Sequence, residues 1–128
     1  MRVLVDTHAL LWAVTGDRRL SPRAHSVLAA LDNEVLVSAA SAWEVCTKYR
    51  LGKLPDAESL ASDFSRIIEQ LGFHPLSISL GHAQRAGNLP GGHRDPFDRI
   101  LIAQAQAEDV PLVSNERLFD TYGIRRLW

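Results

Sequence analysis

The chain has 128 residues, and its 15 acidic and 14 basic side chains give a formal net charge of −1. Its 46% hydrophobic content is that of a folded protein, and we expect residues 1–128 to form a single domain. The near-neutral charge counts against a large nucleic-acid-binding surface, because such surfaces are usually basic. A single cysteine, Cys46, excludes an internal disulfide and fits a reducing cytoplasm, and we expect this residue in the core. Asp6 and His8 interrupt the apolar N-terminus and no apolar run could span a membrane, so neither a signal peptide nor a membrane partner is expected.

The first half of the chain alternates short apolar runs with helical patterns. A strand is predicted at residues 3–5, followed by a helix that stops by Gly16. Ser21 and Pro22 have the sequence of an N-cap and a first helical residue, so a second helix begins there and runs towards residue 31. A second strand follows at residues 34–38, and a helix at residues 41–51 that ends before Gly52.

The second half continues the alternation. Apolar residues at helical spacing predict one helix over residues 57–71, and a weaker helix is expected over residues 79–86. Asp95 and Pro96 open a strong helix that runs to about residue 109. The remaining predicted strands are at residues 73–78, 112–114 and 124–127, and Pro75 favours an edge position for the first of these.

Strands separated by helices imply crossover connections. The sequence therefore predicts an α/β fold with a mostly parallel central sheet of four or five strands and helices on both faces. In such sheets ligands bind beyond the carboxyl ends of the strands.

Four acidic residues follow predicted strands or open predicted helices, and should meet at that edge. Asp6 follows the first strand, Glu44 lies near the start of the helix after the second, Asp98 lies in the first turn of its helix, and Glu116 follows the strand at 112–114. Four carboxylates in one crevice repel each other, and a divalent cation would relieve the repulsion. Oxygen ligands favour Mg²⁺ over zinc. We expect all four acids in a catalytic site, with Asp6 and Asp98 as metal ligands.

Each acid also has a structural interpretation. Asp6 could cap the helix that follows it, and Glu116 could be a first-turn acid favoured by the helix dipole. Glu44 could form a capping box with Ser41, or an ion pair with Lys48 one turn further on. Glu44 taken alone is more often structural than catalytic. The functional interpretation depends on the four acids converging.

Asp95 and Asp98 compete for one role. Pro96 fits the first helical position, which makes Asp95 the N-cap and leaves Asp98 on the helix face of Leu101, so Asp98 should overhang the strand ends. His93 could contact a phosphate or assist proton transfer there, although an ordinary surface histidine is the simpler interpretation. We expect the three tryptophans in the core or in interfaces rather than as base-stacking surfaces: Trp12, Trp43 and Trp128.

Four segments resemble a known family in their order and spacing, and together they cover nearly the whole chain. They are VLVDTHALLWAV, VSAASAWEVCTKYRLGKL, HRDPFDRILIAQAQAEDVPLVSNE and YGIRRLW, and they are similar to bacterial PIN-domain proteins of the VapC toxin type. The resemblance implies a single PIN-like nuclease domain that cleaves RNA with Mg²⁺ or Mn²⁺. It also implies a toxin of a toxin–antitoxin pair, which forms a homodimer and is held inactive by a small antitoxin protein.

The family's carboxylates correspond here to Asp6, Glu44, Asp98 and Glu116, and its hydroxyl residue after the first acid corresponds to Thr7. The fourth acid is often aspartate in the family. Here it is Glu116, preceded by Asn115, so this position departs from the family's pattern. The expected supporting residues are Thr7, Asp95, His93 and Asn115.

Two other functions remain open from the sequence. One is a phosphatase-like hydrolase with Asp6 as the nucleophile, which the absence of a second aspartate two residues later disfavours. The other is a non-catalytic RNA-binding or protein-interaction module with a vestigial acidic pocket. Metal-dependent cleavage of RNA separates the nuclease from this last alternative, and the RNA target stays open.

Overall fold

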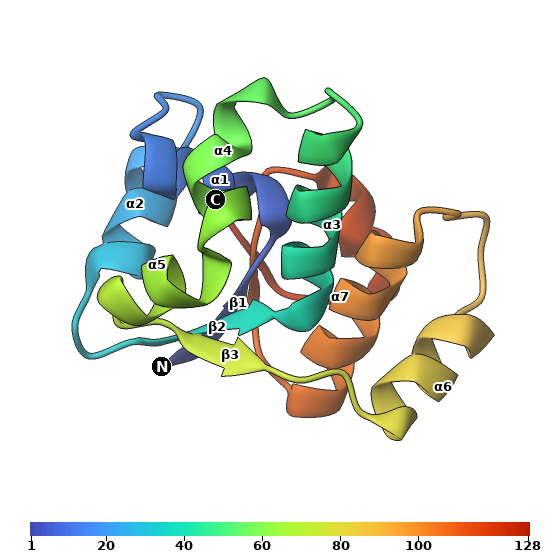
Figure 1. Ribbon diagram of the computed structural model, residues 1–128. Helices are drawn as coiled ribbons and strands as arrows, with labels where there is room; N and C mark the ends of the chain where they lie inside the picture. The colour runs from blue at the N-terminus through green and yellow to red at the C-terminus, as the bar shows by residue number, and fades with distance from the viewer.

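The computed structural model describes all residues 1–128 and contains one five-stranded sheet in which every pair of neighbouring strands is parallel (Figure 1). The strand order is β3-β2-β1-β4-β5, so β1 lies in the centre and β3 and β5 form the edges. The strands are β1 (Arg2–Val5), β2 (Glu34–Ser38), β3 (His74–Leu76), β4 (Leu112–Val113) and β5 (Arg126–Leu127). The predicted α/β class is confirmed, as is the edge position of the strand that contains Pro75.

Seven α-helices and two 3-10 helices cover the sheet on both faces (Figure 1). They are α1 (Thr7–Thr15), α2 (Pro22–Ala29), α3 (Ala39–Arg50), η1 (Pro55–Ala57), α4 (Glu58–Ser62), α5 (Phe64–Gln70), α6 (Leu80–Asn88), α7 (Pro96–Glu108) and η2 (Arg117–Tyr122). None of them has the length and apolar character that a membrane crossing requires.

The central strand contributes to two separate cores. Val3 and Val5 pack in one core with residues of α1, α2, α4 and α5, whereas Leu4 packs in the other with residues of α7. Successive side chains of a strand point to opposite faces, so a strand that is covered on both faces must be apolar at every position. This requirement explains the uninterrupted run of Val3, Leu4 and Val5.

The start of α3 differs from the prediction. Ser38, the last residue of β2, caps the helix by accepting a hydrogen bond from the Ala40 N–H at 3.0 Å. The helix therefore begins at Ala39, two residues before the predicted start, and Ser41 lies inside it. The proposed capping box between Ser41 and Glu44 is wrong. By contrast, Ser21 caps α2 as predicted.

The predicted helix over residues 57–71 is also wrong as a single element. The chain breaks at Asp63, whose φ of −151° and ψ of 56° are not helical, and forms α4 and α5 instead. Leu60 of α4 and Ile68 of α5 nevertheless pack in the same core. Cys46 is exposed rather than buried, because its neighbour Val45 is the residue of that turn that faces the core.

Candidate active site

Asp6 lies at the carboxyl end of β1, in the middle of the sheet, with only 6% of its surface exposed. Its Oδ1 accepts a hydrogen bond from the Ala9 N–H at 2.8 Å, so Asp6 does cap α1. Burial raises the pKa of Asp6 to about 6, the charges of Glu44 and Glu116 add to this effect, and the Ser114 side chain and the Ala9 N–H oppose it. The cap does not satisfy this carboxylate fully, and its ionised form remains costly.

Glu44 projects from α3 and is 2% exposed. Its Oε2 forms an ion pair with the ammonium group of Lys48 one helical turn later, as one of the structural alternatives predicted. Its Oε1 is buried and has no hydrogen-bond partner. Next to it, the Thr7 hydroxyl donates to the Ser41 hydroxyl at 3.0 Å and ties α1 to α3. A buried carboxylate with an unpaired oxygen is costly, and such a group usually has a functional reason.

Asp95 and Asp98 take the positions that the sequence predicts for them. Asp95 caps α7, because its Oδ1 accepts hydrogen bonds from the N–H groups of Phe97 at 2.9 Å and Asp98 at 3.2 Å. Asp98 is the third residue of the helix and is partly buried. Since α7 leads into the start of β4 and runs antiparallel to the strands, its N-terminus lies at the edge where the strands end.

His93 is the closest partner of Asp98. Its Nε2 lies 3.0 Å from Asp98 Oδ2, and its side chain is only 14% exposed, so it is not an ordinary surface histidine. Burial raises the pKa of Asp98 to about 6, the charges of Asp95 and Glu44 contribute, and the hydrogen bond from His93 opposes the shift. The loop that carries His93 is anchored by Arg99, whose guanidinium donates to the His93 carbonyl at 2.8 Å and to the Leu89 carbonyl at 2.8 Å.

Glu116 is the least enclosed of the four acids. It is exposed, and its Oε1 accepts a hydrogen bond from the Leu118 N–H at 3.2 Å, which caps η2. Asn115 beside it is exposed as well. The charge of Glu116 nevertheless acts on Asp6 across the edge. Glu116, where the sequence departs from the family's pattern, is therefore also the most exposed of the four acids.

The four acids interact electrostatically at one edge of the sheet, although each has a local partner. Asp6 is affected by Glu44 and Glu116, and Asp98 by Glu44. No three or more His, Cys, Asp or Glu side chains come together closely enough to hold a metal ion as they stand. The donor set still fits a hard divalent cation, because it consists of carboxylates, two with raised pKa values and one with an unpaired oxygen.

Sequence reasoning did not assign a role at this edge to Ser114 or Arg99. Ser114 follows β4 as Asp6 follows β1, is fully buried, and interacts with the Asp6 carboxylate. The rule that selected Asp6, a polar residue at the end of a buried strand, could have found Ser114. Arg99 had no such signal, because its partners are backbone carbonyls of a loop and leave no pattern in the sequence.

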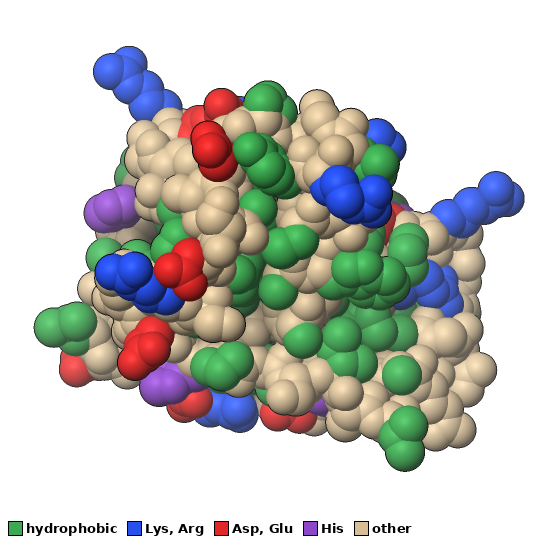
Figure 2. Space-filling model, in the orientation of Figure 1, with side chains coloured by type: hydrophobic (Ala, Val, Ile, Leu, Met, Phe, Trp, Pro, Cys, Tyr) green, Lys and Arg blue, Asp and Glu red, His purple; other side chains and the backbone are tan.

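Trp43 is 61% exposed, so of the two predicted locations, core or interface, it does not occupy the core. It packs edge-on against Phe97, with 4.9 Å between the ring centroids, where α3 meets α7. Hydrophobic side chains gather on this part of the face shown in Figure 2. Trp12 is buried and packs against Trp128, in agreement with the prediction for these two.

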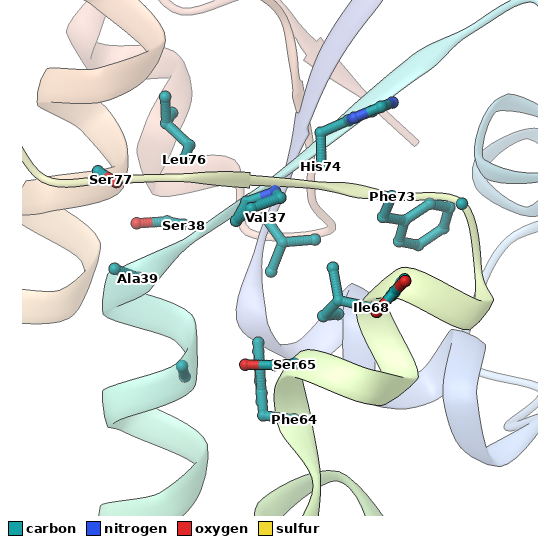
Figure 3. A pocket seen from close by; sticks show the side chains of 14 residues that line it. Val37, Ser38, Ala39, Phe64, Ser65, Ile68, Phe73, His74, Leu76 and Ser77 are labelled. Atoms are coloured by element: carbon teal, nitrogen blue, oxygen red, sulfur yellow. The ribbon is translucent and has the colours of Figure 1, made fainter.

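A cavity of about 650 Å³ lies away from the acids, between β3, α5 and the start of α3 (Figure 3). Val37 and Ile68 point towards one another across it, and Phe64 and Phe73 complete its apolar walls (Figure 3). None of the four predicted acids lines this cavity.

Known proteins resemble this chain in family, sequence and fold. The model of the PIN domain family matches residues 3–124. Ribonuclease VapC16 of Mycobacterium tuberculosis is 45% identical over 60 residues, which span 45% of this chain and 43% of that protein. The matched stretch therefore covers less than half of this relative's length.

Three solved structures share the fold. The structure of VapBC2 from Rickettsia felis, bound to a DNA fragment from their promoter, superposes with a TM-score of 0.66 at 17% identity, covering 98% of this chain and 97% of that chain. VapC20 of Mycobacterium tuberculosis, a toxin that cleaves the sarcin–ricin loop, superposes with a TM-score of 0.69 at 16% identity, covering 95% of each chain. A toxin–antitoxin complex from Klebsiella pneumoniae superposes with a TM-score of 0.56 at 17% identity, covering 90% of this chain and 87% of that chain. At this level of identity the three structures establish a shared fold only.

Proposed function

Because the chain belongs to the PIN-domain family, we propose that it is a Mg²⁺- or Mn²⁺-dependent endoribonuclease that acts as the toxin of a toxin–antitoxin pair. The observation that carries the proposal is the set of electrostatically coupled acids beyond the carboxyl ends of β1, β2 and β4. The ribonuclease to which the chain is similar supports RNA as the substrate.

The metal would be held by Asp6 and Asp98, and Glu44 and Glu116 lie at the same edge of the sheet. We call these four acids the acidic edge. A bound divalent cation supplies an activated water and stabilises the charge that develops on the phosphodiester. Burial and mutual repulsion disfavour the ionised forms of Asp6 and Asp98. We expect a divalent cation to bind there because it would neutralise these carboxylates.

The residues around the acids position them. The hydrogen bond from Thr7 to Ser41 fixes α3 against α1, and thereby places Glu44 near Asp6. His93 orients the Asp98 carboxylate, and Arg99 holds the loop that carries His93. A hydrogen bond to a ligand side chain, such as that of His93 with Asp98, commonly changes metal affinity or activity by about 10–100-fold when it is removed.

The remaining parts of the proposal concern partners and location. We propose that a small antitoxin protein holds the enzyme inactive, that the chain forms a homodimer, and that it acts in the cytoplasm. The toxin–antitoxin complex from Klebsiella pneumoniae, which contains a chain of this fold, supports an antitoxin partner.

The proposal is tested by incubating the purified protein with single-stranded and looped RNA in Mg²⁺ or Mn²⁺. We expect cleavage that stops on chelation and falls on the order of 100-fold or more in Asp6→Asn, which removes a charge at nearly constant shape. The variant must show the circular dichroism of the wild type. Expression of the wild type alone should arrest the growth of a host cell, whereas Asp6→Asn should not.

Cleavage that persists in EDTA, or full activity of Asp6→Asn, contradicts the metal-dependent mechanism. If the protein binds RNA without cleaving it under any metal condition, the non-catalytic module is the correct alternative. A trapped phosphate ester on Asp6 would instead identify a phosphatase-like hydrolase.

A further inference from the structure

Lys48 places a positive charge inside the acidic edge. Its ammonium group pairs with Glu44, lies 6.0 Å from the centre of the Phe97 ring, and interacts with the charges of Asp95 and Asp98. Lys48 therefore faces the carboxylates of both α3 and α7. The chain has one other lysine, Lys53, which is exposed to solvent.

The two partners of this ion pair differ in their access to water. The Glu44 side chain is 3% exposed and fixed in the packing of α3, whereas the Lys48 side chain is 27% exposed. Lysine has a long flexible stem and a strongly hydrated ammonium group, so it can turn into solvent while the buried carboxylate stays in place. The pair can open in one direction only, by departure of the lysine.

The second oxygen of Glu44 indicates what can replace the lysine. Glu44 Oε1 is buried without any hydrogen-bond partner, although Oε2 is paired. An exposed pair between residues four apart on a helix leaves no buried oxygen unpaired. A half-satisfied buried carboxylate beside Asp6 and Asp98 is instead suited to a second cation.

We propose that Lys48 is the internal counter-ion of the acidic edge, which holds Glu44 while no metal is bound and moves into solvent when a divalent cation binds there. This inference rests on the proposed metal-dependent function. Lys48 is thus a positioning residue that competes with the metal, and it makes no contact with the reacting atoms.

Competition has a definite thermodynamic sign. Two cations that neutralise the same carboxylates weaken each other's binding, and the coupling is reciprocal. Removal of the ammonium group should therefore strengthen metal binding, and metal binding should free the ammonium group. If Lys48 instead helped to assemble the site, its removal would weaken metal binding.

The first experiment measures Mn²⁺ binding by isothermal titration calorimetry and electron paramagnetic resonance, without any substrate. Lys48→Met keeps an unbranched side chain that is one atom shorter and removes the charge, and we expect it to bind Mn²⁺ about tenfold more tightly than wild type, within the usual range of such coupling. Lys53→Met is the matched control, because it makes the same change in net charge. At physiological salt its affinity should stay within about twofold of wild type.

The second experiment uses the wild-type chain and does not depend on whether Lys48→Met folds. Limited acetylation followed by mass spectrometry reports the reactivity of the two lysines, with Lys53 as the internal standard. We expect the ratio of Lys48 to Lys53 acetylation to rise severalfold when saturating Mn²⁺ is added. A Lys48→Arg variant, which keeps the charge, should bind Mn²⁺ with nearly wild-type affinity.

The outcomes separate the two proposals. If wild type binds no Mn²⁺ and cleaves no RNA, the proposed function and this inference fall together. If wild type binds Mn²⁺ but Lys48→Met binds it equally or more weakly, or the acetylation ratio is unchanged, the counter-ion role alone is overturned and the metal-dependent function stands.

Discussion

The acidic edge and the apolar cavity both adjoin the carboxyl end of β2, yet they are built in opposite ways. At the acidic edge, buried carboxylates have pKa values near 6 or an oxygen without a partner. In the cavity, Val37, Phe64 and Ile68 meet each other and no charge is buried (Figure 3). An apolar pocket is the usual first hypothesis for a ligand site. We propose that the chemistry of this protein lies instead at the acidic edge, where burial is costly.

The two regions should contribute differently to stability and to the proposed function. Burial of apolar side chains stabilises the protein, whereas burial of carboxylates that lack full compensation destabilises it. Substitutions in the two regions should therefore have opposite effects. At the acidic edge they should remove activity and preserve or increase stability, and at the cavity they should reduce stability and preserve activity.

The largest expected effect separates Asp98, at the acidic edge, from Asp95, which caps the same helix. We expect Asp98→Asn to lower RNA cleavage on the order of 100-fold with little loss of stability, because it removes a charge from the edge at constant shape. Asp95→Ala should instead destabilise the protein by about 0.5–2 kcal/mol, as the loss of an N-cap does, and keep most of the activity. Cleavage rates and urea unfolding of both variants measure this.

Asp95→Asn is the control, since asparagine caps helices about as well as aspartate. It should be nearly as stable as wild type. A stable but inactive Asp95→Ala together with an active Asp98→Asn would show that the two roles are reversed.

The next effect tests the apolar side of the comparison. Ile68 is 4% exposed, and its truncation in Ile68→Ala should lower the free energy of unfolding by about 2–5 kcal/mol. Below the unfolding transition, cleavage of RNA should continue at close to the wild-type rate. Ile68→Val is the matched variant and should destabilise by about 0.5–1.5 kcal/mol. A large loss of cleavage in folded Ile68→Val would connect the cavity to the active site and remove the contrast between the two regions.

The sequence predicted the features that short-range rules control. The sheet, its edge strand and the N-caps Ser21 and Asp95 follow from apolar runs and from capping chemistry. The convergence of Asp6 and Glu44 follows from the rule that parallel strands end at one edge.

Features that depend on tertiary packing were not predictable in this way. The predicted helix over residues 57–71 is interrupted at Asp63, between Leu60 and Ile68 of one core, and local periodicity does not reveal this interruption. The contact of His93 with Asp98 depends on Arg99, which binds loop carbonyls brought near by the fold. Contacts of this kind form between residues that the fold brings together, and no regular spacing in the sequence predicts them.

The last expected effect is a gain in stability at the acidic edge. In EDTA at pH 7, we expect Asp6→Asn to be more stable than wild type by about 1–3 kcal/mol, because the variant no longer buries an ionised carboxylate whose pKa is raised from 3.8 to about 6. Asparagine keeps the cap on the Ala9 N–H, so α1 should lose little. Addition of Mg²⁺ should stabilise wild type more than the variant, because a ligand stabilises the state that binds it.

The gain should depend on pH with a definite sign. Below about pH 4 Asp6 is protonated in both the folded and the unfolded state, so its pKa shift contributes nothing to the difference between the proteins. Between pH 4 and pH 6 the unfolded state loses this proton first, and the wild type loses stability as the pH rises. Above about pH 6 Asp6 is ionised in both states, and the folded wild type carries the full cost of its buried charge. Burial and the charges of Glu44 and Glu116 cause this cost, and the hydrogen bond with the Ser114 side chain only partly offsets it. Thermal unfolding of both proteins in EDTA from pH 4 to pH 7 measures this, and a difference that shrinks with rising pH contradicts the view that buried charge is costly at this edge.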